Sequence, residues 1–100
     1  MTDIISFLQY IRFEKRFSAN TVLAYENDLK QFFEFQKKLY EVEAPGDINQ
    51  SMVRSWMVSM MEKGVGARSV NRKITSLKTF YKFLLRRGDV KTNPLLKVIS

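Results

Sequence analysis

Apolar residues recur every three or four positions along most of the chain, which is the spacing of helices that bury one face. The alternation of apolar and polar residues that is typical of β-strands is absent. The pattern predicts four helices: over about residues 3–15, from residue 19 toward Tyr40, from residue 50 to Lys63, and from residue 67 to about Arg87. The predicted fold class is all-α.

Residues suited to helix ends stand at the predicted boundaries. Side chains that can accept hydrogen bonds from the first backbone amides precede three of the helices, at Thr2, Ser18 and Asn49. Gly64 and Gly88 follow the third and fourth helices, where a left-handed residue commonly ends a helix. A turn at Pro45-Gly46 separates the second helix from the third.

The apolar face of each predicted helix defines a predicted core. The stripes are Ile4, Phe7, Leu8 and Ile11; Val22, Tyr25, Leu29, Phe32 and Phe33; Met52, Val53, Trp56, Met57 and Met60; and Val70, Ile74, Leu77, Tyr81 and Leu84. Phe35 and Phe83 lie off their stripes. We expect them at a contact surface for another domain or subunit, with burial in a wide core as the alternative.

Residues 66–83 resemble residues 18–35. The two segments are identical at the aligned pairs Ala19/Ala67, Val22/Val70, Leu29/Leu77, Lys30/Lys78, Phe32/Phe80 and Phe35/Phe83. The same alignment pairs the first predicted helix with the third, although few residues of these two helices match. The duplication predicts a four-helix bundle built from two helical hairpins, and chance similarity between amphipathic helices is the alternative.

The chain contains neither cysteine nor histidine. It therefore lacks disulfides, thiolate ligands, the commonest metal ligand and the commonest general base. We expect no catalytic residues, no metal site and no cofactor. No apolar run approaches the roughly 20 residues of a membrane span, and the N-terminus does not resemble a signal peptide. These features predict a cytoplasmic, monomeric domain without membrane contact.

The segment after Gly88 contains Asn93-Pro94, which disfavours helix at Asn93. Apolar residues without an evident partner follow it: Leu95, Leu96, Val98 and Ile99. We expect residues 1–88 to form one domain and residues 89–100 to begin a linker to a further domain that is absent from this sequence.

Positive charge is concentrated in the fourth predicted helix. The formal net charge of the chain is +7, and the segment from Lys63 to Gly88 holds eight basic residues and no acidic one. The outward face of this helix carries Arg68, Arg72, Thr75, Thr79, Lys82 and Arg86, flanked by Asn71 and Lys78. No acidic residue interleaves to form stabilising pairs, and the helix dipole disfavours cations in the first turns. The face therefore predicts a polyanionic partner, against the alternative of an ordinary solvated surface.

The equivalent face of the second helix is small and neutral. Its outward residues are Asn20, Thr21, Ala24, Asn27 and Gln31. Such a surface can approach a nucleic-acid backbone closely, and the helix N-terminus behind Ser18 can hold a phosphate. An ordinary capped helix with surface residues is the alternative.

Motifs from both long helices occur in an order that resembles a known family. They are Phe17-Ser18, Thr21, Tyr25, Asp28-Leu29 and Phe32; Ser69-Val70-Asn71-Arg72, Ser76-Leu77 and Phe80-Tyr81; Phe83-Leu84; and Asn93-Pro94. Together they resemble the N-terminal core-binding domain of tyrosine recombinases, of the Xer type and of phage or transposon integrases. The resemblance covers essentially the whole chain.

The resemblance implies a SAM-like four-helix bundle that forms half of a C-shaped clamp on double-stranded DNA at the core recombination site. The second and fourth helices would face the DNA. The implied DNA-binding residues are Asn20, Thr21, Arg68, Ser69, Asn71, Arg72, Thr75, Lys78, Thr79 and Lys82. The other implied partners are further recombinase protomers.

In this family the tyrosine nucleophile lies in a catalytic domain beyond the Asn-Pro linker, so the fragment itself is expected not to be an enzyme, whereas its parent is. One departure concerns Gly66, because the family commonly has Ser or Thr at that cap, and glycine offers no hydroxyl to a phosphate. The alternative function is a helical protein-interaction module whose basic face binds an acidic partner.

Overall fold

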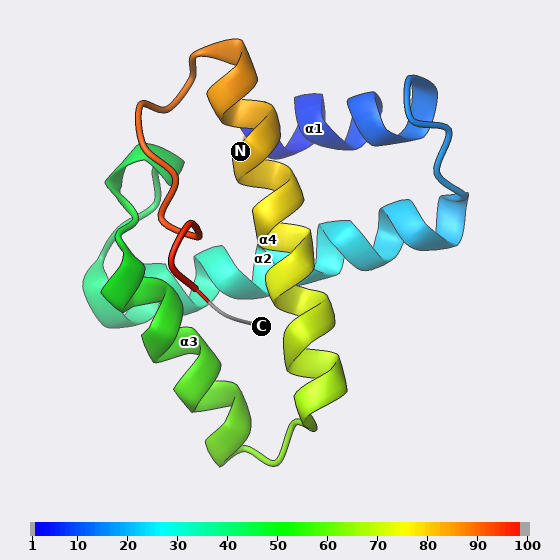
Figure 1. Cartoon of the computed structure of the whole chain (residues 1–100). Coiled ribbons are helices and arrows are strands. Elements are labelled where there is room, and N and C mark those ends of the chain that lie inside the picture. Colours follow the sequence, from blue (N-terminus) through cyan, green and yellow to red (C-terminus); the bar gives the residue numbers. More distant parts are fainter. Residues whose placement is uncertain (1, 99–100) are drawn as a thin grey trace.

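The computed structural model describes residues 2–98, apart from the side chain of Thr2. Within this range it contains no strand, and the α-helices are α1 (Thr2–Phe13), α2 (Ala19–Tyr40), α3 (Gln50–Glu62) and α4 (Ala67–Arg87) (Figure 1). A short 3-10 turn, η1 (Pro45–Asp47), lies between α2 and α3. The all-α prediction is confirmed. The side chain of Thr2, which was predicted to cap the first helix, and the apolar residue Ile99 lie outside the described part.

The helices end where local chemistry predicts. The Ser18 hydroxyl accepts a hydrogen bond from the Thr21 amide, and the Asn49 side chain accepts one from the Met52 amide. Gly64 and Gly88 have φ of 87° and 79°, the left-handed conformation expected of helix stops. α2 ends at Tyr40, but its C-cap was not predicted, since it is Glu41, a non-glycine residue with φ of 57°.

Two helical hairpins cross each other, as the duplication predicts. α1 and α2 form one hairpin, α3 and α4 form the other, and α4 runs across both α1 and α2 (Figure 1). The helices begin at positions that correspond in the duplicated segments. The start of α1 at Thr2 aligns with the start of α3 at Gln50, and the start of α2 at Ala19 aligns with the start of α4 at Ala67. The repeated sequence thus corresponds to a repeated arrangement of helices.

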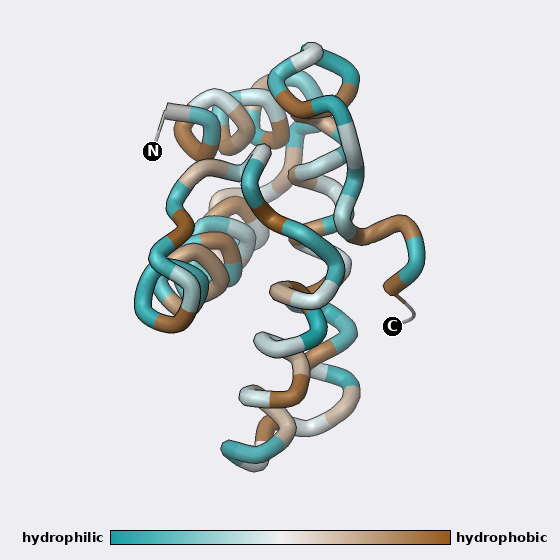
Figure 2. Tube along the Cα trace, turned by 90° about the vertical axis from the view of Figure 1, so that its left-hand side faces the viewer, coloured by the Kyte–Doolittle hydropathy of each residue, from teal (hydrophilic) through white to brown (hydrophobic). Residues whose placement is uncertain are grey.

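Aromatic side chains fill the centre of the bundle. Phe7, Phe32, Phe80 and Tyr81 are fully buried, and the ring centroids of Phe7 and Phe80 lie 5.3 Å apart with the edge of one ring toward the face of the other. Figure 2 shows apolar and polar residues alternating along each helix, as expected when one face packs inward. The predicted stripes face this core, although five of their members are only partly buried: Leu8, Val22, Tyr25, Met52 and Met57.

Phe83 corrects a sequence prediction. Its ring packs 5.5 Å from that of Phe7 and 4.9 Å from that of Tyr10, centroid to centroid. Phe35 is likewise half-buried against the core. The core is wide enough to absorb both rings, because α1 and α3 cover the flanks of the α2–α4 crossing. Neither ring is exposed as a contact surface.

The segment after α4 also differs from expectation. Leu95 and Val98 are buried in the core, and Val90 joins them, so most of the apolar tail has a partner within the domain. Leu96 is the exception at 80% exposure. The tail turns back beside α4, where Leu95 and Asn93 line a hollow with Lys78 and other residues (Figure 1). The proposed division of the chain at residue 88 remains a prediction.

Tyr81 ties α4 to the connection between α2 and α3. Its buried hydroxyl donates a 2.7 Å hydrogen bond to the carbonyl oxygen of Pro45. Burial, together with the nearby charge of Asp3, raises the pKa of Tyr81 well above its ordinary value. The neutral phenol is therefore the form that the fold requires.

Candidate nucleic-acid interface

The outward face of α4 and the first turns of α2 present most of the predicted DNA-binding residues to solvent. The exposed ones are Asn20, Thr21, Arg68, Ser69, Asn71, Arg72, Thr75 and Lys82. Lys78 and Thr79 are half-buried. α4 itself contains no acidic residue. The face is continuous along the helix and positively charged, as a polyanion site requires.

Threonine hydroxyls on this face already have partners in their own helix. The hydroxyl of Thr75 donates to the carbonyl oxygen of Asn71, and that of Thr79 donates to the carbonyl oxygen of Thr75, each at 3.0 Å. The Thr21 hydroxyl lies 2.9 Å from that of Ser18 within the cap of α2. These small side chains can therefore accept a hydrogen bond from a ligand, but their hydroxyl hydrogens are already used within the protein.

Arg72 is not an unpaired cation. Its guanidinium donates two hydrogen bonds to the carboxylate of Asp28 in α2, at 2.7 and 3.1 Å. Lys73 and Ser76 donate to the same carboxylate at 3.1 and 2.7 Å. α4 has no acidic residue of its own, as the sequence showed, but Arg72 is paired all the same, because Asp28 reaches α4 from another helix. The sequence signal that could have revealed it is an aspartate adjoining the apolar stripe of α2.

A positively charged hollow of about 320 Å³ joins α4 to the end of α1. Lys82 and Arg86 line it from α4, and Lys15 lines it from the α1–α2 connection. Arg86 donates a 3.3 Å hydrogen bond to the hydroxyl of Tyr10, and the ammonium of Lys15 lies 5.9 Å from the centroid of the same ring. Lys15 was not among the predicted site residues, because it lies far from α4 along the chain.

The tail adjoins the C-terminal half of the basic face. Lys78, Thr79 and Lys82 line one hollow together with Leu95 and Leu96. Lys82 thus stands between this hollow and the positively charged one. Contacts of the tail explain why Lys78 is half-buried, whereas Arg68, about three turns away near the start of the helix, is exposed.

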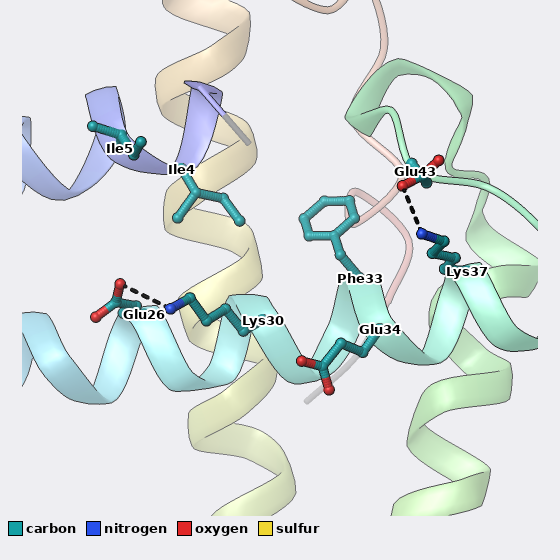
Figure 3. Close-up of a pocket in the computed structure, with 8 residues that line it drawn as sticks. All are labelled: Ile4, Ile5, Glu26, Lys30, Phe33, Glu34, Lys37 and Glu43. Carbon is teal, nitrogen blue, oxygen red and sulfur yellow. Dashed lines mark ion pairs between the residues drawn. The ribbon is translucent and has the colours of Figure 1, made fainter.

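A third and larger hollow, of about 590 Å³, lies between α1 and α2 and differs in charge (Figure 3). Ile4 and Phe33 form its apolar floor. Its charged residues include two ion pairs, Glu26–Lys30 at 3.2 Å and Lys37–Glu43 at 3.3 Å, and Glu34, which forms no ion pair within residues 2–98. Its three glutamates outnumber its two lysines, so this hollow does not suit a polyanion.

The first turns of both long helices lack acidic residues, so no side-chain carboxylate there competes with an anion, although in α2 the Thr21 amide already donates to Ser18. Gly66 caps α4 without a side-chain hydrogen bond, as the glycine at this position predicts. Across the described residues, no helix is both long enough and apolar enough to cross a membrane.

Comparisons with known proteins agree with this architecture. The family described as phage integrase, N-terminal SAM-like domain, matches residues 4–88. The chain is 44% identical over 93 residues to tyrosine recombinase XerC of Leptospira interrogans, an alignment covering 88% of this chain and 28% of that protein. It is 35% identical over 88 residues to XerC of Anoxybacillus flavithermus, covering 88% of this chain and 29% of the relative.

A third relative, tyrosine recombinase XerD of Rickettsia bellii, is 34% identical over 100 residues, which cover 98% of this chain and 32% of that protein. The chain thus spans about a third of the length of the curated relatives it matches. No solved structure matches it. The match over residues 4–88 shows that this chain belongs to the phage integrase N-terminal SAM-like domain family, whose full-length relatives here are tyrosine recombinases.

Proposed function

We propose that this domain binds double-stranded DNA on behalf of a site-specific tyrosine recombinase, through the outward face of α4 and the first turns of α2. The DNA is the core recombination site, held while a separate catalytic domain cuts and rejoins strands. Other recombinase protomers on the same DNA are the further partners. The relatives named above are tyrosine recombinases, and they support the second part of this proposal.

The observation that carries the proposal is the charge of the α4 face. Arg68, Lys82 and Arg86 are exposed there, and within residues 2–98 none of them forms an ion pair with an acidic side chain. Lys15 adds a further cation from outside the helix. Unpaired cations on one face repel each other, so their arrangement is explained by a ligand that neutralises them.

The dimensions of α4 suit a duplex. A helix of 21 residues is about 30 Å long, which exceeds the roughly 12 Å width of the major groove. Basic residues along such a helix can reach phosphates on both sides of the groove while short polar residues between them approach the bases. Asn71 and Thr75 lie between the basic residues Arg68 and Lys82 along α4.

The test is a titration of the chain with a short DNA duplex, followed by fluorescence anisotropy at several salt concentrations between about 50 and 200 mM. The variant Arg68→Gln/Lys82→Gln should bind more weakly, with a salt slope shallower by up to about 1.8, since each phosphate contact contributes about 0.9. The matched control is Arg54→Gln/Lys38→Gln, which removes two exposed cations from α3 and the C-terminal part of α2.

Two results would contradict the proposal. One is the absence of binding even at the lowest salt concentration. The other is equal loss of affinity in the test variant and the control, because a loss that depends only on net charge would not locate a site. Binding to polyglutamate as strong as binding to DNA would instead favour the alternative function, a protein-interaction module for an acidic partner.

A further inference from the structure

The carboxylate of Asp28 is buried at the crossing of α2 and α4. Its side chain is 1% exposed, and each of its oxygens accepts two hydrogen bonds. Oδ2 accepts from Arg72 and Ser76, and Oδ1 accepts from Arg72 and Lys73. A carboxylate has about four acceptor sites, so every site of Asp28 is occupied by a residue of α4.

The three donors differ in what they leave exposed. Ser76 is buried and the side chain of Lys73 is only 14% exposed, whereas the side chain of Arg72 is 51% exposed. A guanidinium has five N–H donors in one plane, and Asp28 takes two of those of Arg72. Three donors therefore remain, on a group whose plane and direction are held by a two-point contact.

This pairing changes what Arg72 can contribute to binding. A carboxylate at hydrogen-bond distance cancels much of the field of the guanidinium at the distance of a phosphate. Arg68 and Lys82 have no such partner within the described residues and keep their full charge. Arg72 is thus a weaker phosphate ligand than its neighbours, but its fixed donors suit a directional contact with a base edge, such as the O6 and N7 atoms of guanine.

We infer that Asp28 is a positioning residue and that Arg72, held by it, determines sequence specificity by donating to a base in the major groove. This inference rests on the proposed DNA-binding function and deepens it. The unpaired cations of the α4 face then bind phosphates, and Arg72 contacts a base. Lys73, which also donates to Gln31 at 2.8 Å, braces the carboxylate rather than contacting DNA.

The experiment first selects a preferred duplex from a randomised pool with the unaltered chain, and then measures its affinity and that of a scrambled duplex as a function of salt. Arg72→Lys keeps the charge but loses the planar fork. We expect its affinity for the preferred duplex to fall about tenfold, within a range of roughly five- to a hundredfold, while its affinity for the scrambled duplex changes less than about twofold. Arg68→Lys, the matched control at an unpaired position of α4, should leave the ratio of the two affinities unchanged.

Asp28→Asn supplies the second readout. It should also lower the preference for the selected duplex, yet raise affinity for the scrambled duplex and steepen the salt slope by up to about 0.9, because the released guanidinium becomes free to bind a phosphate. Removal of the carboxylate charge alone would steepen the slope but would leave the ratio of the two affinities unchanged, so the loss of preference is the result that identifies Asp28 as a positioning residue. Because this variant removes a buried charge, its helicity is checked by circular dichroism, and Arg72→Lys carries the test if it does not fold.

Three outcomes would overturn the inference while leaving the proposed function intact. In the first, the chain binds DNA but selects no preferred sequence. In the second, Arg72→Lys leaves the ratio of the two affinities unchanged. In the third, Arg72→Gln loses the same affinity on both duplexes and has a salt slope shallower by about 0.9, which would make Arg72 a phosphate ligand. Failure of the unaltered chain to bind any duplex would overturn the proposed function as well.

Discussion

The Asp28 carboxylate accepts a 2.7 Å hydrogen bond from the hydroxyl of Ser76, a residue 48 positions further along the chain. The same offset relates the two similar segments, so the two residues hold equivalent positions in α2 and α4. The helices therefore cross at matching points of the duplication. At that point the first copy supplies an acceptor and the second copy supplies its donors, which makes the two hairpins complementary rather than identical.

Replacing Ser76 with alanine should destabilise the domain by about 2 kcal/mol, because hydrogen bonds to charged groups contribute roughly 1.5–3 kcal/mol and the carboxylate stays buried without one of its donors. Urea unfolding measures the change. Ser69→Ala, a substitution of an exposed serine on the same helix, is the control and should alter the free energy of unfolding by less than about 0.5 kcal/mol. Equal effects in the two variants would show that the buried hydroxyl has no special importance.

Replacing Tyr81 with phenylalanine should cost about 1 kcal/mol near neutral pH, because the carbonyl oxygen of Pro45 loses its 2.7 Å donor. Burial raises the pKa of Tyr81 in the folded state, so folding is favoured while the phenol is neutral and loses stability as pH rises above the unfolded value of about 10. The difference in the free energy of unfolding between the unaltered protein and Tyr81→Phe should therefore become smaller above that pH. Chemical unfolding at a series of alkaline pH values measures this difference. A difference that stays constant with pH would contradict a contribution from ionisation of Tyr81.

Leu95→Ala and Leu96→Ala test whether the tail belongs to the core. The side chain of Leu95 is 2% exposed and that of its neighbour is 80% exposed. The first substitution should lower the free energy of unfolding by about 2–3 kcal/mol through loss of buried area and the cavity left behind, and the second by less than about 0.5 kcal/mol. Thermal or urea unfolding distinguishes them, and two similarly small effects would mean that the tail packs only loosely.

Gly66→Ser should stabilise α4 by a few tenths of a kcal/mol, since serine can cap the first amides and the position has an ordinary extended conformation with space for a side chain. Gly64→Ser is the contrasting variant. Gly64 has φ of 87°, so its substitution should destabilise the domain by roughly 1 kcal/mol. Melting temperatures that move in the same direction for both variants would contradict this account of the α3–α4 turn.

Lys15→Ala should weaken DNA binding by about three- to tenfold at moderate salt and make the salt slope shallower by about 0.9, if the hollow it lines with Lys82 and Arg86 holds one phosphate. Lys91→Ala, at another exposed lysine outside that hollow, is the control. Anisotropy titrations measure both. An unchanged slope in Lys15→Ala would restrict the DNA-binding surface to the two long helices.

The positions of the helices follow from short-range chemistry. Ser18 and Asn49 cap helices because their side chains reach amides three residues later, and Gly64 and Gly88 end helices because glycine adopts positive φ without steric cost. These features depend only on residues that are close together in the sequence. Glu41 escaped prediction because a non-glycine residue with positive φ has no equally clear local signal.

The candidate site was predictable only in part. Helical periodicity placed Arg68 and Lys82 on the exposed face correctly, because the direction of a side chain on a helix depends on its register alone. It could not indicate that Arg72 pairs with Asp28, 44 positions earlier, or that Lys15 joins the same surface as Arg86. These relationships arise where separate helices meet.

The amino-acid sequence alone determined the four helices, their buried stripes and the concentration of positive charge in one of them, since each depends on residues within a few positions of one another. Only the tertiary structure decided which of those charges remain unpaired, that the tail packs against the core, and that Phe83 is partly buried. The physical reason is that burial and ion pairing depend on distances in space, and the crossing of the two hairpins sets those distances.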